Sequence, residues 1–195
     1  MGKFLKKVIS IIIFILLDSM FCTEKSSFMP NLPVGTFKIK FKVASICNDS
    51  IDYPLKFKYF ISKPTPTQTL LKGNVTLKNP FDDRLYFNMN LAVWSKIGGW
   101  KDNAFIFKNK GACSNMKFIY GNVWNDFLLK HHFTDCPVKP GFYKVDGFDL
   151  SQLAQANITK RFFYGTYKPS IFFTDEKNVQ HGCLFFIIDI LRPWE

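Results

Sequence analysis

The chain has 195 residues and carries 26 Lys+Arg against 15 Asp+Glu, a formal charge of +11 at pH 7. Hydrophobic residues make up 47% of it and aromatic residues 17%, including 23 phenylalanines. This length suits one domain of ordinary size and excludes a large multidomain enzyme, and the apolar content excludes a disordered chain.

The N-terminus has the organisation of a secretory signal peptide. Three lysines are followed by the apolar run Val8–Leu17, which is shorter than the roughly 20 residues that a membrane-spanning helix needs. A retained signal anchor is the alternative that this short run disfavours. We predict a signal peptide over residues 1–22, a single domain over residues 30–195, and a soluble product that is secreted to the extracellular space.

The site of signal cleavage stays open, because cuts after Ser19 and after Cys22 both fit the sequence. Removal of residues 1–22 takes away three Lys and one Asp, so the formal charge falls from +11 to +9. Export makes the positive charge a poor indicator of nucleic-acid binding. We therefore expect no nucleic-acid partner.

Cysteine usage agrees with export. Cleavage after Cys22 leaves four cysteines, an even number that suits two disulfides in an oxidising compartment, whereas cleavage after Ser19 leaves Cys22 as an odd thiol. Four cysteines allow three connectivities. No C-x-x-C pair is present, so neither a metal nor a redox site is predicted. The four cysteines are Cys47, Cys113, Cys136 and Cys183, and the asparagines of three N-glycosylation sequons are Asn48, Asn74 and Asn157.

The predicted elements are mostly short strands. Residues 37–43 alternate four apolar side chains with three lysines, which is typical of a half-buried strand whose outer face is covered by lysine. Similar patterns predict strands at 53–61, 70–77, 85–93, 105–107, 142–145, 162–173 and 183–191, with a weakly helical stretch at 151–160 and a hairpin turn at 175–182.

One helix is predicted between two of the cysteines. Ser114 or Asn115 is suited to cap it, and Gly121 weakens it. Its apolar positions recur at threes and fours: Met116, Ile119, Val123, Phe127 and Leu128. Seven or eight strands with one short helix predict an all-β fold, a single antiparallel β-cup or β-sandwich with two sheets as in immunoglobulin domains.

Few residues are suited to catalysis. His131 and His132 lie close to Asp135 and Cys136, which would allow a metal or nucleophile site. We prefer the interpretation that Cys136 belongs to a disulfide and that the two histidines lie in a solvated loop. No known catalytic or nucleotide-binding motif occurs, so we predict a protein that is not an enzyme and has no cofactor.

The aromatic content is unusual for a small exported β domain. Phe, Trp and Tyr together number 34, more than the interior of a thin sandwich readily holds. Either the sheets enclose a cavity or an apolar surface binds a partner. The alternative is that these rings only fill the core.

Several segments resemble the ganglioside activator proteins: Asp135–Tyr143, Gly165–Phe173, Gly182–Phe186 and Gly73–Leu77. Within the wider ML lipid-recognition superfamily, they look most similar to the insect chemosensory CheB/CheA-like secreted proteins, over about residues 35–190. The resemblance implies a disulfide-tied β-cup that carries a lipid. It also implies the pairs Cys47–Cys183 and Cys113–Cys136, and it places residues 150–163 at the lip of the cup.

We therefore predict a binder or carrier of a lipid or other small hydrophobic ligand, with a role in pheromone or taste signalling. The alternative is an extracellular interaction protein that modulates a membrane receptor or channel. A membrane surface or a receptor is a further expected contact, and we expect a monomer. Three tryptophans, Trp94, Trp100 and Trp124, are predicted near the rim. Candidate ligand-binding residues are Phe87, Met89, Leu91, Val93, Phe105, Phe107, Phe127, Phe172, Phe186 and Ile188.

Overall fold

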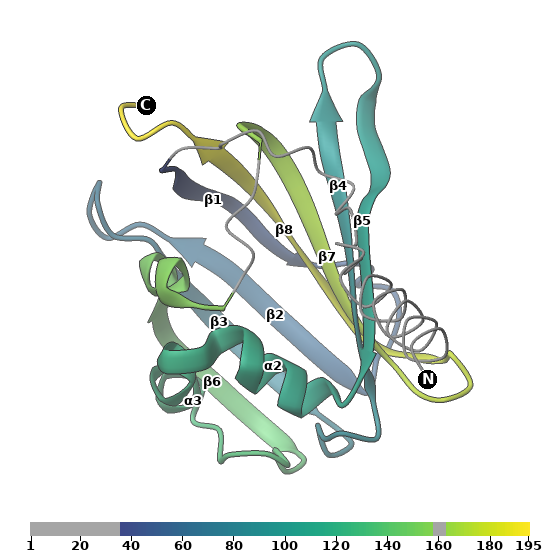
Figure 1. Ribbon diagram of the computed structural model, residues 1–195. Helices are drawn as coiled ribbons and strands as arrows, with labels where there is room; N and C mark the ends of the chain where they lie inside the picture. The colour runs from purple at the N-terminus through teal and green to yellow at the C-terminus, as the bar shows by residue number, and fades with distance from the viewer. Residues whose placement is uncertain (1–35, 158–162) are drawn as a thin grey trace, which may run out of the picture. The chain divides into compact units, whose positions relative to one another are not determined.

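The computed structural model describes residues 36–157 and 163–195, which belong to one compact unit, Val34–Glu195. In this part of the chain, eight strands form two antiparallel sheets (Figure 1). One sheet has five strands in the order β1-β8-β7-β4-β5, and the other has three in the order β2-β3-β6. The expected all-β, two-sheet fold is thereby confirmed. The predicted signal peptide and Cys22 lie outside the described residues.

The strands and helices have the following bounds. The five-stranded sheet consists of β1 (Lys38–Ile46), β4 (Tyr86–Ser95), β5 (Gly99–Lys110), β7 (Gly165–Thr174) and β8 (Gln180–Leu191). The three-stranded sheet consists of β2 (Leu55–Ser62), β3 (Leu70–Leu77) and β6 (Gly141–Asp149). Helical elements are α2 (Ala112–Tyr120), the 3-10 turn η1 (Gly121–Val123), α3 (Trp124–His131) and the 3-10 helix η2 (Leu150–Gln155).

β1 shows the predicted alternation as far as Phe41. An irregularity between Phe41 and Val43 then breaks it, so that Val43, predicted on the inner face, is 38% exposed. Lys38, Lys40 and Lys42 are exposed, and Phe41 is buried. Lys42 forms an ion pair with Asp189 of the neighbouring strand β8, at 2.7 Å. The lysines of this strand therefore cover the outer surface of the sheet, as expected.

β5 is much longer than the predicted segment 105–107. It pairs with β4 from Tyr86↔Lys110 to Ser95↔Gly99, with an irregularity between Leu91 and Val93. Its polar residues give no apolar alternation, and the strand is defined by backbone pairing at the edge of the sheet. Sequence periodicity alone could not reveal such a strand.

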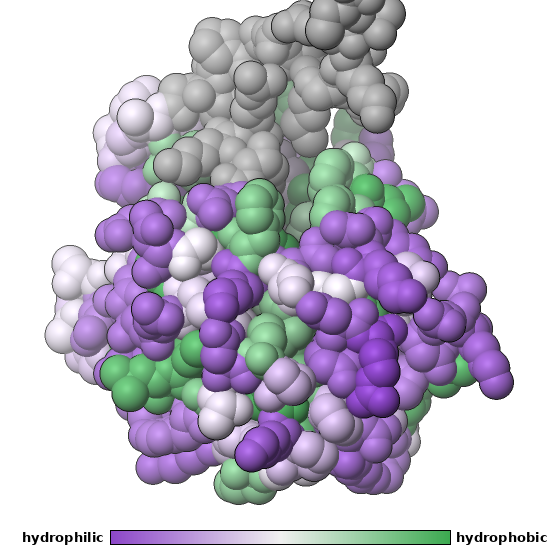
Figure 2. Space-filling view, turned by 60° about the horizontal axis from the view of Figure 1, so that its bottom comes forward, coloured by the Kyte–Doolittle hydropathy of each residue, from purple (hydrophilic) through white to green (hydrophobic). Residues whose placement is uncertain are grey.

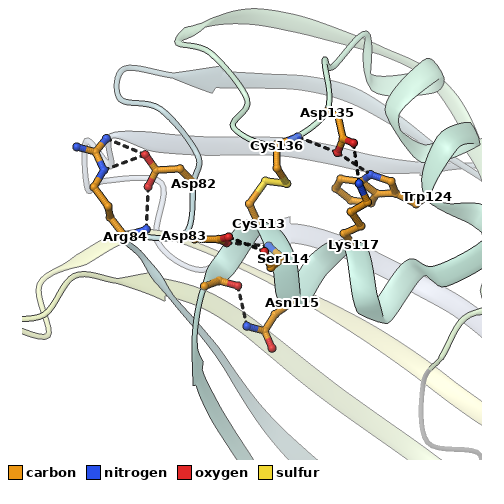
Figure 3. The surroundings of a disulfide bond; sticks show 11 residues. Asp82, Asp83, Arg84, Cys113, Ser114, Asn115, Lys117, Trp124, Asp135 and Cys136 are labelled. Atoms are coloured by element: carbon orange, nitrogen blue, oxygen red, sulfur yellow. Dashed lines mark hydrogen bonds and ion pairs between the residues drawn. A yellow bond between two sulfur atoms is a disulfide. The ribbon is translucent and has the colours of Figure 1, made fainter.

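The helical segment spans residues 112–131, where α2, the 3-10 turn η1 and α3 follow one another directly. The prediction that Ser114 or Asn115 caps it was wrong, since Gly111 occupies the N-cap position in a left-handed conformation with φ 88°. A carboxylate from outside the helix takes the capping role: Asp83 accepts a hydrogen bond from the Ser114 backbone N–H at 2.8 Å (Figure 3). Gly121, with φ 53°, separates α2 from α3.

Two disulfides tie the fold, with the pairing that the family resemblance implied. Cys47–Cys183 joins the end of β1 to β8, and Cys113–Cys136 joins the first turn of α2 to the segment before β6. They lie 136 and 23 residues apart in sequence. In the loop-entropy description, such bridges stabilise the fold by about 5 and about 3 kcal/mol respectively.

The two sheets come together at one end and spread apart toward the other (Figure 1). At the narrow end, a Cβ atom on Gly182 of β8 would lie 2.6 Å from the Leu55 carbonyl oxygen of β2, so a side chain does not fit there. The helical segment packs against β6 of one sheet and against β4 and β5 of the other. It therefore covers the gap between the two sheets on that side.

Candidate functional site

A cavity of about 50 Å³ lies between the two sheets and the helical segment. Every residue that lines it is apolar or aromatic. Each of these residues belongs to one of the two groups of buried residues that form the core, or packs against one. The lining residues are Phe57, Tyr59, Leu71, Leu77, Phe81, Met116, Tyr120, Trp124, Phe127, Phe133, Val138, Ile171, Phe173, Leu184 and Phe186.

The period of each element explains which of its residues reach the cavity. On β7, Ile171 and Phe173 line it, as expected for alternate residues of one strand. On the helical segment, the lining positions Met116, Tyr120 and Trp124 are four residues apart and therefore share one face. The cavity is thus a product of the same alternation that forms the core.

Two tyrosines, Tyr59 and Tyr120, contribute side-chain hydroxyl groups to the residues that line the cavity. No hydrogen bond is formed by the hydroxyl of Tyr59 on β2 or that of Tyr120 on α2 among the described residues. Burial raises the pKa of each hydroxyl above its usual value, and for Tyr59 the neighbouring Tyr120 raises it further. Both therefore stay neutral at physiological pH and are free to donate a hydrogen bond to a ligand.

His131, at the end of α3, is fully buried beside the cavity wall. Its Nδ1–H donates a hydrogen bond to the Phe127 carbonyl at 2.8 Å, while no described residue offers its Nε2 a partner. The ring lies 3.9 Å from the Phe127 ring and 5.7 Å from the Tyr59 ring, between centroids. This apolar surrounding lowers the pKa of His131 from 6.5 to about 4, so the ring is neutral at pH 7.

The residues considered for catalysis do not converge. Cys136 forms its disulfide, and His132 binds Asp146 at 2.6 Å. Asp135 accepts hydrogen bonds from Lys117 and from the Trp124 indole, which all point toward one another in Figure 3. The hydrogen bond from Lys117 is the main reason that the pKa of Asp135 falls to about 2.

The placement of the two histidines in a solvated loop was wrong for His131, because aromatic rings cover it completely. His132 does follow the helix, as its C-cap residue with φ 54°. Within residues 36–157 and 163–195, no group of three or more His, Cys, Asp or Glu side chains is arranged to hold a metal ion.

The ten predicted ligand-binding residues fall into three environments. Phe127 and Phe186 line the cavity. Six more belong to the core without reaching it: Phe87, Leu91 and Ile188 are buried, and Met89, Val93 and Phe107 are half-buried against the core. The other two lie elsewhere: Phe172 is half-buried on β7, and Phe105 on β5 is 40% exposed.

Strand geometry explains the last two positions. Phe172 lies between Ile171 and Phe173, which both line the cavity, so its side chain points to the opposite face of the sheet. Phe105 pairs with Leu91 in the distal half of β5, where residues 101–106 are all exposed. Of the predicted rim tryptophans, Trp94 is exposed and Trp100 half-buried, whereas Trp124 is buried and lines the cavity.

Thirteen of the fifteen lining residues were not among the ten candidates. For part of them, the sequence holds a usable signal. On β2, Leu55, Phe57 and Tyr59 alternate with Lys56 and Lys58, which predicts an inward apolar face. Phe133 and Val138 lie outside regular elements and follow no period, so that only the fold shows their position.

The three sequon asparagines lie away from the cavity wall. Asn48 is exposed, and Asn74 on β3 has the opposite orientation to its buried neighbour Val75. Asn157 is exposed and donates a hydrogen bond to the Phe118 carbonyl at 2.8 Å. The rest of its sequon lies outside the described residues. One face of the molecule, shown in Figure 2, is mostly hydrophilic, with apolar residues in smaller groups between polar ones.

No family model matches this chain, and no curated protein matches it. The resemblance to the ganglioside activators accordingly stays a prediction from sequence motifs. The part of the chain that the structure describes contains no helix with the length and apolar character needed to cross a membrane.

Proposed function

We propose that this protein is a secreted, non-enzymatic binder or carrier of a lipid or other small hydrophobic ligand, which it takes up between its two sheets. The cavity carries this proposal, because fifteen apolar or aromatic residues from both sheets, the helical segment and the loops beside them surround it. Apolar ligand surface gains roughly 25 cal/mol per Å² on transfer from water to such a site. The resemblance to CheB/CheA-like proteins supports pheromone or taste signalling as the setting.

The cavity must enlarge to take a ligand. Its volume of about 50 Å³ is below the roughly 300–1,000 Å³ of most small-molecule sites. The helical segment is suited to this movement, since it supplies Met116, Tyr120, Trp124 and Phe127 to the wall and is divided at Gly121. We propose that it shifts outward when the ligand enters.

The cavity wall also defines the chemistry of the ligand. The hydroxyls of Tyr59 and Tyr120 have no hydrogen-bond partner within residues 36–157 and 163–195, and both are suited to bind one oxygen atom of a ligand. A charged carboxylate would lose its hydration in this apolar site without a cation to pair with it. A neutral long-chain molecule with one hydrogen-bonding oxygen, such as an alcohol, aldehyde or ester, is the class we propose.

A pair of neighbouring substitutions tests the site. Ile171→Trp fills the cavity, whereas Phe172→Trp changes the next residue, which points away from it. We expect the secreted protein to take up a pyrene-labelled fatty alcohol, with affinity at least tenfold lower for Ile171→Trp and within twofold of wild type for Phe172→Trp. Leu184→Phe, on the partner strand, replaces Ile171→Trp if that variant does not fold.

Two outcomes would overturn the proposal. One is a wild-type protein that shows no probe uptake and no co-purifying hydrophobic molecule by native mass spectrometry. The other is equal loss of uptake in the inward and outward variants. For the ligand class, Tyr59→Phe and Tyr120→Phe should each weaken binding of the alcohol probe about fivefold, and leave a probe with a plain hydrocarbon chain unchanged.

The second candidate is an extracellular interaction protein that modulates a membrane receptor or channel without a bound ligand. The small size of the cavity favours it, because the interior is nearly filled. This alternative predicts no uptake of any apolar probe, together with binding to a cell-surface partner that weakens as salt is added.

A further inference from the structure

The β4–β5 hairpin extends beyond the rest of the sandwich (Figure 1). β4 pairs with β7 as far as Val93↔Tyr167, and from there to Ser95↔Gly99 its only partner among the described residues is β5. An irregularity in the β4–β5 pairing, between Leu91 and Val93, changes the direction of the strands here. Opposite it, Asn103 has φ 60° and forms two hydrogen bonds with Asn90. We call residues 94–101 the hairpin tip.

The hairpin tip has an apolar side chain, Ile97, in its turn, where a turn in water usually has polar ones, and two aromatic side chains on the strands beside it. Ile97 is 101% exposed and Trp94 is 48% exposed. The rings of Trp94 and Trp100 pack edge to face across the hairpin, with centroids 5.2 Å apart. Gly99 has φ 66°, and a Cβ atom at this position would lie 3.7 Å from the Trp94 ring, so the turn packs close to the aromatic pair.

The charges of the hairpin tip have one sign. Lys96 and Lys101 are exposed, and residues 94–101 include no Asp or Glu. The ammonium group of Lys168 on β7 lies 5.2 Å from the centre of the Trp100 ring. Asp102, which directly follows the tip, lies 3.9 Å from Lys168. The tip therefore combines two cations with two indole rings and a fully exposed isoleucine, and Lys168, which is paired with Asp102, lies beside it.

We propose that the hairpin tip binds the surface of an anionic lipid bilayer, with Ile97 and Trp94 inserted at the level of the lipid headgroups. Tryptophan prefers this interface because its ring is apolar and its N–H is polar. Each lysine near an anionic membrane surface favours binding by about 1 kcal/mol, or about fivefold. Insertion stays shallow, since the peptide groups of the turn need hydrogen-bonding partners that the hydrocarbon region lacks.

The shape of the tip favours a bilayer over a folded protein partner. A protein interface usually requires a broad surface of about 800 Å² on each side with a polar rim. The tip is a narrow two-stranded projection with its apolar residue at the very end. Such a projection enters a soft interface more readily than it covers a flat one. This inference does not depend on the proposed ligand.

Co-sedimentation with vesicles tests the proposal. We expect the secreted protein to bind vesicles of phosphatidylcholine with 30% phosphatidylserine at low salt, and to bind pure phosphatidylcholine at least tenfold less. Ile97→Ser should weaken binding to the anionic vesicles about tenfold or more, and Lys96→Gln with Lys101→Gln about twentyfold or more. Insertion should also shift the tryptophan emission of the wild type to the blue.

Matched controls come from the opposite sheet. Phe142 on β6 is 69% exposed, and Lys139 is exposed just before it. Phe142→Ser and Lys139→Gln should leave vesicle binding within twofold of wild type. The proposal is overturned if the wild type ignores anionic vesicles, if control and tip variants lose binding equally, or if Ile97→Ser has no effect. Uptake of the pyrene probe without vesicles should be the same in Ile97→Ser and wild type.

Discussion

Tryptophan occupies two contrasting regions of this protein, the cavity wall and the hairpin tip. Trp124 is 4% exposed, its ring stacks on Phe127 at 5.6 Å between centroids, and its indole N–H donates to Asp135. Trp94 is 48% exposed, and its ring packs edge to face on Trp100. The same residue type therefore stabilises the fold in one region and offers a surface to a partner in the other. Aromatic content alone cannot distinguish these two uses.

The largest expected difference between the regions is in stability. Phe127→Ala removes a buried ring that packs on Tyr120, Trp124 and Phe148, so we expect the free energy of unfolding to fall by about 3–5 kcal/mol. Trp94→Ala removes an exposed ring and should change it by about 0.5 kcal/mol or less. Urea denaturation of both variants measures this. Equal losses would contradict the assignment of the two regions.

The cavity wall could be predicted from sequence only where a strand alternates clearly. β3 has the predicted bounds and supplies Leu71 and Leu77 to the wall. The predicted apolar face of β4 packs in the core without reaching the cavity, and Asn88 on its other face is buried. Phe172 is a different case: Lys168 and Ser170 precede it and Thr174 follows it at every second position, so the alternation does indicate its outward face, and its prediction as a ligand-binding residue missed this signal. Its orientation is set by pairing with β4 and β8, which are distant in sequence.

The burial of His131 could not be predicted, because it depends on rings from separate parts of the chain. The rings that cover it come from β2, α3, the following loop and β6: Tyr59, Phe127, Phe133 and Phe148. No local pattern brings these residues together. The turn at the hairpin tip is evident from its glycines and lysines in the sequence. Its projection beyond the sandwich is not, because it depends on where β7 begins and stops pairing with β4.

The cavity wall is tied covalently, and the hairpin tip is not. Cys113→Ser combined with Cys136→Ser opens a loop of 23 residues, so the free energy of unfolding should fall by about 3 kcal/mol. Because this disulfide holds the first turn of α2, hydrogen exchange should accelerate most in the helical segment. Unchanged exchange in the helical segment, with faster exchange at the hairpin tip, would contradict the conclusion that this disulfide stabilises the helical segment.

Acid should lower the free energy of unfolding, because His131 is buried in its neutral form beside the cavity. Its pKa is about 4 when folded and 6.5 when exposed, so between these values the unfolded chain binds more protons than the folded one. Stability is then complete above pH 6.5 and falls as the pH drops toward 4, by about 3 kcal/mol in total. His131→Asn should flatten this dependence, as followed by urea denaturation from pH 7 to pH 4.

His132 provides the control for this titration. Its side chain is 55% exposed and pairs with Asp146 at 2.6 Å, so water reaches it in both states. His132→Asn should keep most of the slope between pH 6.5 and pH 4. A slope that disappears in His132→Asn and persists in His131→Asn would assign the acid sensitivity to the surface pair instead.

The smallest expected effect is local to the hairpin tip. An isolated two-stranded ribbon is marginally stable in water, and an aromatic pair across it contributes about 0.5–1.5 kcal/mol. Trp100→Ala should therefore speed amide exchange within residues 94–101 by about threefold to tenfold, and leave exchange in β7 and β8 unchanged. Since β4 and β5 pair only with each other at the tip in the part of the chain that the structure describes, opening of the tip does not require the sandwich to open. Faster exchange throughout the larger sheet would show instead that the tip and the sandwich unfold together, and the tip could then not act as an independent contact surface.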